Sequence, residues 1–219
     1  FANGALVGYY RLDETSGTIA ADSSQNSNDG TMNGGLDAAN DSVGAIIETG
    51  VEFDGTDDDI NLGQASYLVG LSELSFSFWM NIPSIDLSAV DSTGIILQAD
   101  DWSNVYGCRL DGNDDTIWCY VEVSDVNSLV KIPISSITPG KWEHVAYTFN
   151  AGSSEIYLNG VSVDTATSGT VTSIPNLTGD LFIGKNEAPP AGDYYFEGKL
   201  DDIRVYNKEL TATEVLELY

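Results

Sequence analysis

The only two cysteines of the chain lie in one short stretch, residues 106–123, which reads YGCRLDGNDDTIWCYVEV. The glycine, asparagine and aspartates at its centre are typical of a tight turn between two strands. When the stretch folds about Asn113 and Asp114, Cys108 lies opposite Cys119, and directly opposed strand residues are close enough for a disulfide. The spacing therefore predicts a β-hairpin closed by a Cys108–Cys119 disulfide, with two buried free thiols as the alternative. A disulfide indicates an oxidising, extracellular compartment, so we expect a secreted protein.

The face of this hairpin that carries no cysteine combines aromatic rings with polar groups. Because side chains alternate along a strand, Arg109, Trp118 and Tyr120 share that face. Aromatic rings stack on the apolar face of a sugar, and forked donors and carboxylates bind its hydroxyls. The pattern predicts a carbohydrate-binding surface; the alternative is that these rings cover the core or pack against a neighbouring loop. Together with the upstream segment DDWSNVYG, the predicted ligand-binding residues are Asp100, Trp102, Asn104, Tyr106, Arg109, Trp118 and Tyr120.

Two segments near opposite ends of the chain carry the oxygen-rich groups that calcium prefers. In KLDDIRVY, strand alternation places Asp201 on the same, core-facing side as Ile203, with Asp202 pointing outward. A core-facing carboxylate is costly unless a cation or hydrogen-bond donors accompany it. Asp22 opens the oxygen-rich loop DSSQNSNDG, so a structural calcium is predicted; the alternative is an Asx turn at Asp22 and an Asp201 bonded to backbone amides. The predicted calcium ligands are Asp22, Ser27, Asn28, Gly30 and Asp201.

Short strands would position all of these groups. LSFSFWM and HVAYTF alternate along their length, and EIYLNGVSV places Asn159 and Gly160 between two alternating runs, a strong hairpin signal. LFIG, KLDDIRVY and GVEFDG are further strand signals, and one helix is predicted near residue 211, where Thr211 and Glu214 form a capping box. The sequence predicts an all-β fold, a two-sheet antiparallel jelly-roll sandwich with a short C-terminal helix, in a single domain over residues 1–219.

The net charge of the chain limits the classes of ligand that it can bind. Thirty-four acidic against 8 basic residues give a net charge of −26 and a pI near 4.1, which disfavours nucleic acid and strongly anionic glycans. Part of this acidity lies in DGTDDD at 54–59, which lacks the glycine and closing glutamate of a calcium loop and is interpreted as a solvated turn. With no apolar run long enough to cross a bilayer and no signal-like segment, we expect a mature secreted protein or a module of a longer one.

Five segments, in their order along the chain, carry a family resemblance. They are LVGYYRLDETSGTIAADSSQNSNDGT, VEFDGTDDDINLG, LSFSFWMNI, GKWEHVAYTFNAGSSEIYLNGVSVD and FEGKLDDIRVYNKELTATEV. Together they resemble the laminin G-like, concanavalin A-like jelly rolls of extracellular bacterial modules over nearly the whole chain. The resemblance implies two curved antiparallel sheets, often a structural calcium with Asp22 and Asp201 as anchors, and usually carbohydrate or cell-surface binding.

Catalytic patterns of such jelly rolls do not match the sequence. Retaining glucanases of this shape carry carboxylates at E-x-D-x-x-E or E-x-D-x-E, and neither string occurs here. The single histidine, His144, lies in the framework segment GKWEHVAYTF without a nucleophile elbow. We therefore expect no enzymatic activity, but a non-catalytic carbohydrate-binding module for a neutral or weakly charged polysaccharide or oligosaccharide, monomeric and attached to a larger extracellular protein. The alternative is a protein-interaction or adhesion module; a glycosidase or polysaccharide lyase is the least favoured interpretation.

Overall fold

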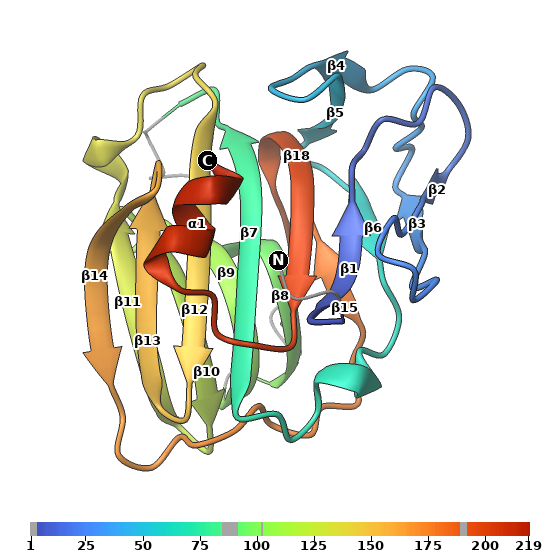
Figure 1. Ribbon diagram of the computed structural model, residues 1–219. Coiled ribbons are helices and arrows are strands. Elements are labelled where there is room, and N and C mark those ends of the chain that lie inside the picture. Colours follow the sequence, from blue (N-terminus) through green and yellow to red (C-terminus); the bar gives the residue numbers. More distant parts are fainter. Residues whose placement is uncertain (1–3, 85–91, 102, 189–191) are drawn as a thin grey trace.

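A computed structural model describes residues 4–84, 92–101, 103–188 and 192–219. Two eight-stranded antiparallel sheets pack face to face (Figure 1), and two further strands pair with each other in a small third sheet. In the first, called the β7 sheet, the strand order is β14-β13-β12-β7-β18-β5-β4, and β1 also pairs with β18. In the second, called the β9 sheet, the order is β11-β10-β9-β8-β15-β6-β3-β2. The predicted two-sheet jelly-roll sandwich is confirmed.

The chain passes repeatedly from one sheet to the other, in runs of one to four consecutive strands. The β7 sheet consists of β1 (Leu6–Tyr10), β4 (Ser42–Gly44), β5 (Thr49–Asp54), β7 (Glu73–Asn81), β12 (Glu143–Asn150), β13 (Ser153–Leu158), β14 (Val161–Thr167) and β18 (Glu197–Tyr206). The β9 sheet consists of β2 (Ile19–Ala20), β3 (Gly30–Asn33), β6 (Asp59–Asn61), β8 (Ser92–Asp101), β9 (Asn104–Asp111), β10 (Thr116–Val123), β11 (Val126–Pro133) and β15 (Leu181–Ile183). The small third sheet is β16 (Lys185–Ala188) with β17 (Gly192–Tyr195), and two 3-10 turns are η1 (Ser66–Leu68) and η2 (Ile134–Ser136).

The core lies between the inner faces of the two sheets and is built from alternate strand residues. Phe76 and Phe78 of β7 are fully buried, as their spacing predicts. The ring of Phe76 stacks on Tyr147 of the same sheet and on Tyr106 of the facing sheet, with centroids 6.4 Å apart in each case. The aromatic residues thus join the two layers.

A β-bulge interrupts β18 and changes which side its acidic residues occupy. Asp201 pairs with Trp79 and Arg204 with Ser77, so β18 has one residue more than β7 over this interval. Asp202 is that extra residue, with φ 52°. Asp201 therefore shares the outer side of Trp79 rather than the core side of Ile203, and the simple alternation predicted for KLDDIRVY is wrong.

The helix α1 (Ala212–Leu218) lies across the outer face of the β7 sheet (Figure 1). Its predicted capping box is present, with Thr211 and Glu214 each accepting the other's backbone N–H. Val215 and Leu218 pack with Tyr206 in a separate apolar cluster on that face. Among the residues that the structure describes, no helix is long and apolar enough to cross a membrane.

Candidate functional site

The predicted hairpin is present in the predicted register. Cys108 pairs with Cys119 and Arg109 with Trp118 across β9 and β10. The two sulfur atoms are bonded at 2.02 Å, and both cysteines are fully buried on the core side. The disulfide prediction is confirmed, and the free-thiol alternative is wrong.

Trp118 lies on the outer face of the β9 sheet and is flanked by two cations. The guanidinium of Arg109, on β9, lies 4.5 Å from the centroid of the Trp118 ring, and the ammonium of Lys131, on β11, lies 4.3 Å from it. The indole Nε1–H donates to Asp114 at 3.0 Å. No local sequence pattern indicates that Lys131 lies beside Trp118, because this contact depends on the pairing of β10 with β11.

Accessibility differs sharply across this outer face. Trp118 is half-buried, and the side chains of Lys131 and Asp114 are 37% and 35% exposed. Tyr120 is only 2% exposed, and Arg109, which pairs with Asp111 at 2.9 Å, is 8% exposed. A ligand on this face would therefore meet Trp118, Lys131 and Asp114 first.

Neighbouring hydrogen-bond donors keep the Asp114 carboxylate ionised, so that it accepts their hydrogen bonds. Burial alone would raise the pKa of Asp114, but hydrogen bonds from Lys131, Thr116 and Trp118 lower it below its ordinary value. The carboxylate is therefore charged at neutral pH and fixes the orientation of the indole. Burial raises the pKa of Tyr120 to about 12, so its phenol remains protonated.

Tyr106 does not belong to the outer face. It pairs with Val121, points between the layers, and is fully buried against Phe76. Its hydroxyl donates to Gln98. Including Tyr106 among ligand-binding residues is wrong, because alternation places it on the same side as Cys108 rather than Arg109.

The upstream polar residues hold loops at the far end of the hairpin. Asp100 accepts the backbone N–H groups of Thr178 and Gly179, at 2.7 and 2.8 Å. Asn104 pairs with Val123, five residues along β10 from Trp118 and hence about 16 Å away. Trp102 lies outside the described residues. The predicted cluster is therefore not one compact site around Trp118.

The Asp22 loop forms an Asx turn. The Asp22 carboxylate accepts backbone N–H groups of Tyr9, Ser24 and Asn28 at 2.8–2.9 Å. Burial opposes the charge, but these bonds and that of the Ser24 hydroxyl lower the pKa of Asp22. The remaining predicted ligands serve the fold: Asn28 binds Val7 through its side chain and Tyr10 through its carbonyl, Ser27 has φ 58°, and Gly30 is buried in β3.

Asp22 and Asp201 lie on opposite sides of β1. Tyr10 of β1 pairs with Ile203 of β18 on one side and forms a β-bridge with Asp22 on the other. Two strand spacings separate the backbones, about 10 Å, and both carboxylate oxygens of Asp22 already accept hydrogen bonds from Tyr9, Ser24 and Asn28. The structure thus uses the Asp22 carboxylate to hold its own loop, and a calcium ion shared by Asp22 and Asp201 stays a prediction.

Asp201 instead faces a second carboxylate across residues 47–49. Asp201 is fully buried and accepts the Ile47 N–H at 3.2 Å through Oδ2, while its Oδ1 has no hydrogen-bond partner among the described residues. Asp13 accepts the Thr49 N–H at 3.0 Å through Oδ1; its Oδ2 lies 2.9 Å from Arg11, in an ion pair without hydrogen-bond geometry. Burial, and then the charges of Asp202 and Asp13, raise the pKa of Asp201 to about 7. An unpartnered buried carboxylate oxygen fits a cation ligand.

A separate acidic cluster occupies the turn after β5. Asp54, Asp57 and Asp58 bring carboxylate oxygens within 4.8 Å of one another, close enough to hold a metal ion. Residues 54–57 are exposed, as the interpretation of a solvated turn expects, whereas Asp58 and Asp59 are only 6% and 5% exposed and depart from it. Asp58 accepts the Asp54 N–H at 3.0 Å, which accounts for part of its burial.

The single histidine is enclosed on the opposite face of the molecule. His144 is 1% exposed, and its Nε2 lies 2.9 Å from the Ser77 hydroxyl. Within the described part of the chain its Nδ1 has no hydrogen-bond partner, so no carboxylate orients it as in a catalytic triad. The rings of Trp79 and Tyr219 cover it, with centroids 5.1 and 6.1 Å away.

The fold and the sequence together identify the protein family. Residues 54–216 match the family described as the Concanavalin A-like lectin/glucanases superfamily (Laminin_G_3), and the chain belongs to it. The comparison with curated proteins found no significant match.

Solved structures show the same fold at low sequence identity. Domain 4 of AbnA, a GH43 extracellular arabinanase from Geobacillus stearothermophilus in complex with arabinotriose, is similar over 98% of each chain, with 21% identity and a TM-score of 0.75. The binding domain of Paraclostridial Mosquitocidal Protein 1 is 15% identical with a TM-score of 0.77. The binding domain of botulinum neurotoxin serotype D is 16% identical with a TM-score of 0.71. The chain spans 52% of each toxin domain.

Proposed function

We propose that this chain is a non-catalytic carbohydrate-binding module for a neutral or weakly charged glycan. The observation that carries the proposal is the half-exposed Trp118 indole, framed by Lys131 and Asp114 on the outer face of the β9 sheet. A sugar ring would take the place of the flexible Lys131 ammonium against the indole, while the Asp114 carboxylate and the displaced ammonium bind hydroxyls.

The ligand class follows from charge and from one structural relative. A net charge of −26 repels anionic chains. The similar arabinanase domain was solved with arabinotriose, a neutral oligosaccharide, which supports a neutral glycan here as well.

A structural calcium is the second part of this proposal. Asp201, with Asp13 beside it, would hold the ion where β18 exchanges β5 for β1 as its neighbour. Bound calcium would compensate the buried carboxylate charge and fix residues 47–49 between the two strands. It would stabilise the scaffold without touching the sugar.

The cellular setting completes the proposal. The disulfide supports secretion, and the match over 98% of a domain of an extracellular arabinanase supports a single domain that is a module of a larger protein; the module would act as a monomer.

A protein-interaction module is the competing function. It is favoured by the exposed apolar side chains of the edge strand β14, where Val161 and Val163 are 66% and 41% exposed. Exposed edge strands pair readily with other chains. A glycan screen distinguishes the two functions, because a protein-binding module should give no sugar hits.

The test is a glycan array with and without EDTA, followed by calorimetric titration of the hits with Trp118→Ala. Loss of one stacked ring should weaken binding about tenfold. Tyr219→Ala is the matched control, because Tyr219 is an aromatic residue, 56% exposed, that lies after α1 against Trp79 of the β7 sheet. Equal affinity of wild type and Trp118→Ala would place the sugar elsewhere, and an array without hits would favour a protein partner.

A further inference from the structure

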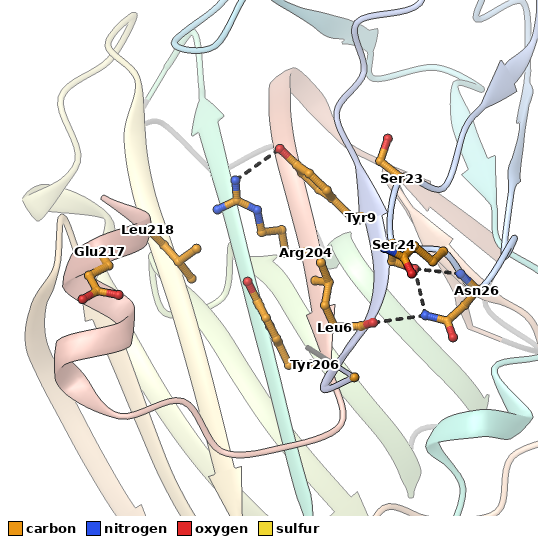
Figure 2. A pocket seen from close by; sticks show the side chains of 11 residues that line it. Leu6, Tyr9, Ser23, Ser24, Asn26, Arg204, Tyr206, Glu217 and Leu218 are labelled. Atoms are coloured by element: carbon orange, nitrogen blue, oxygen red, sulfur yellow. Dashed lines mark hydrogen bonds between the residues drawn. The ribbon is translucent and has the colours of Figure 1, made fainter. Parts of the chain in front are cut away.

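A groove crosses the outer face of the β7 sheet, on the opposite side of the molecule from Trp118. It runs between α1 on one side and β1 with the loop that joins β2 to β3 on the other, and β18 forms its floor (Figure 2). This α1 groove, defined by Leu6, Tyr9, Ser23, Asn26, Arg204 and Leu218 among its lining residues, has a volume of about 670 Å³. That volume lies within the range of small-molecule sites.

The floor of the α1 groove is aromatic and contains a balanced ion pair. The Arg204 guanidinium lies 4.7 Å from the centroid of the Tyr9 ring and 2.9 Å from Asp202, which is 2% exposed. The Tyr9 hydroxyl donates to Asp202 at 2.6 Å and accepts from Arg204 at 3.2 Å. Burial, and then the bond to Asp202, raise the pKa of Tyr9, so the phenol stays protonated. The positive charge is thus already neutralised within the protein, and the floor demands no charged ligand.

One wall of the groove is polar and held in place. The Asx turn at Asp22 fixes the loop, and Asn26 donates from its side chain to the Leu6 carbonyl at 3.1 Å and to the Ser24 hydroxyl at 3.0 Å (Figure 2). Ser23 and Gln25 of this loop are exposed at the groove. Fixed hydroxyl and amide groups reduce the entropy lost on binding.

The opposite wall is α1, which presents Leu218 and Glu217. The helix is fixed at its start by the capping box and by Lys208, which donates to Glu214 at 2.6 Å. The groove is therefore bounded by two ordered walls, one with hydroxyl and amide groups and one with an apolar side chain and a carboxylate. This combination suits a polyhydroxylated ring with one apolar face.

We propose that the α1 groove is a second carbohydrate site, which takes one or two residues of a neutral glycan. It rests on the proposed function in one respect, that the chain binds neutral sugars. The sugar would pack on Tyr9 and Leu6 and exchange hydrogen bonds with Ser23, Asn26 and Glu217. Because the two sites lie on opposite sheets, a short oligosaccharide cannot occupy both, and the module would bridge two glycan chains.

The test is a titration of the isotope-labelled full chain with arabinotriose and, separately, with xylotriose, followed by nitrogen–proton correlation spectra. Amide signals of Ser24, Asn26 and Leu218 report the groove, and the Trp118 indole signal reports the β9 sheet face. Both sets should shift in the wild type, each with its own dissociation constant. In Ser23→Trp, which fills the groove from an exposed position, the groove shifts should weaken at least tenfold while the Trp118 titration is unchanged.

Thr213→Trp is the matched control, because Thr213 is exposed on α1 but does not line the groove. It should leave both titrations unchanged. Shifts at Trp118 without shifts at the groove would overturn the second site and leave the proposed function standing. Shifts at the groove alone would support the second site and contradict the role of Trp118. No shift with either sugar would overturn the groove and count against sugar binding altogether.

Discussion

The buried His144 predicts a specific acid sensitivity. It lies under Trp79 and Tyr219, beside the C-terminal end of α1, and is 1% exposed. Burial, and then the positive charge of Arg204, lower the pKa of His144 from 6.5 to about 4. Because the folded-state pKa is depressed, the unfolded chain takes up a proton first as the pH falls. The contribution to stability is complete above pH 6.5, declines as the pH falls from there, and reaches its minimum near pH 4.

The size of this stability loss follows from how far the pKa of His144 is lowered. Each pKa unit corresponds to about 1.4 kcal/mol, so the change from 6.5 to about 4 costs about 3 kcal/mol when complete. At pH 5 the cost is about 2 kcal/mol, because the folded state is still almost entirely unprotonated there. His144→Gln removes the titration, so its free energy of unfolding should fall by about 2 kcal/mol less than that of the wild type between pH 8 and pH 5.

The assay is urea unfolding at pH 8 and pH 5, compared between wild type and variant so that effects of the carboxylates cancel. Ser77→Ala is the control, since it removes the hydrogen bond at Nε2 but keeps the imidazole, and it should lose stability in parallel with the wild type. His144 is the only histidine, so its ring proton signals in NMR also give the native pKa directly. Parallel stability profiles for wild type and His144→Gln, or a native midpoint near 6.5, would refute the reasoning.

Two further predictions concern the Cys108–Cys119 disulfide and the proposed calcium ion. Replacing Cys108 and Cys119 together by alanine should lower the free energy of unfolding by about 2–3 kcal/mol in urea, because the bridge closes a short loop with a sequence separation of 11; no loss of stability would contradict this. Calcium should raise the melting temperature of the wild type relative to EDTA, and Asp201→Asn should abolish that rise while Asp57→Asn, in the other acidic cluster, keeps it. The reverse pattern would move the ion to the turn after β5.

Local patterns in the sequence were sufficient for the fold. Alternation identified the core faces of β7 and β12, and the turn residues at 113–114 fixed the register that joins Cys108 to Cys119. The capping box located α1. Each of these features depends on neighbours in the chain, and period-two alternation leaves a single register that buries the apolar set.

The candidate sites depended on contacts that no local pattern contains. The extra residue in β18 invalidated a simple alternation for Asp201, and bulges carry no reliable sequence mark. Lys131 joins Trp118 only through the pairing of β10 with β11, and Tyr9 meets Arg204 only because β1 pairs with β18. Asp22 lies in an oxygen-rich loop, as the sequence predicts, and the backbone N–H groups of Tyr9 and Asn28 that bond its carboxylate come from segments that no local pattern places there.

The β-bulge in β18 has a consequence for ligand charge. Asp202 is the extra residue of the bulge. Without it, the side chains of β18 would still alternate between the core and the outer face. Deleting this one residue would straighten β18 yet leave Arg204 above the Tyr9 ring, now with no counter-ion. The charge balance on the floor of the α1 groove therefore depends on the length of β18 as well as on the side chains that line it.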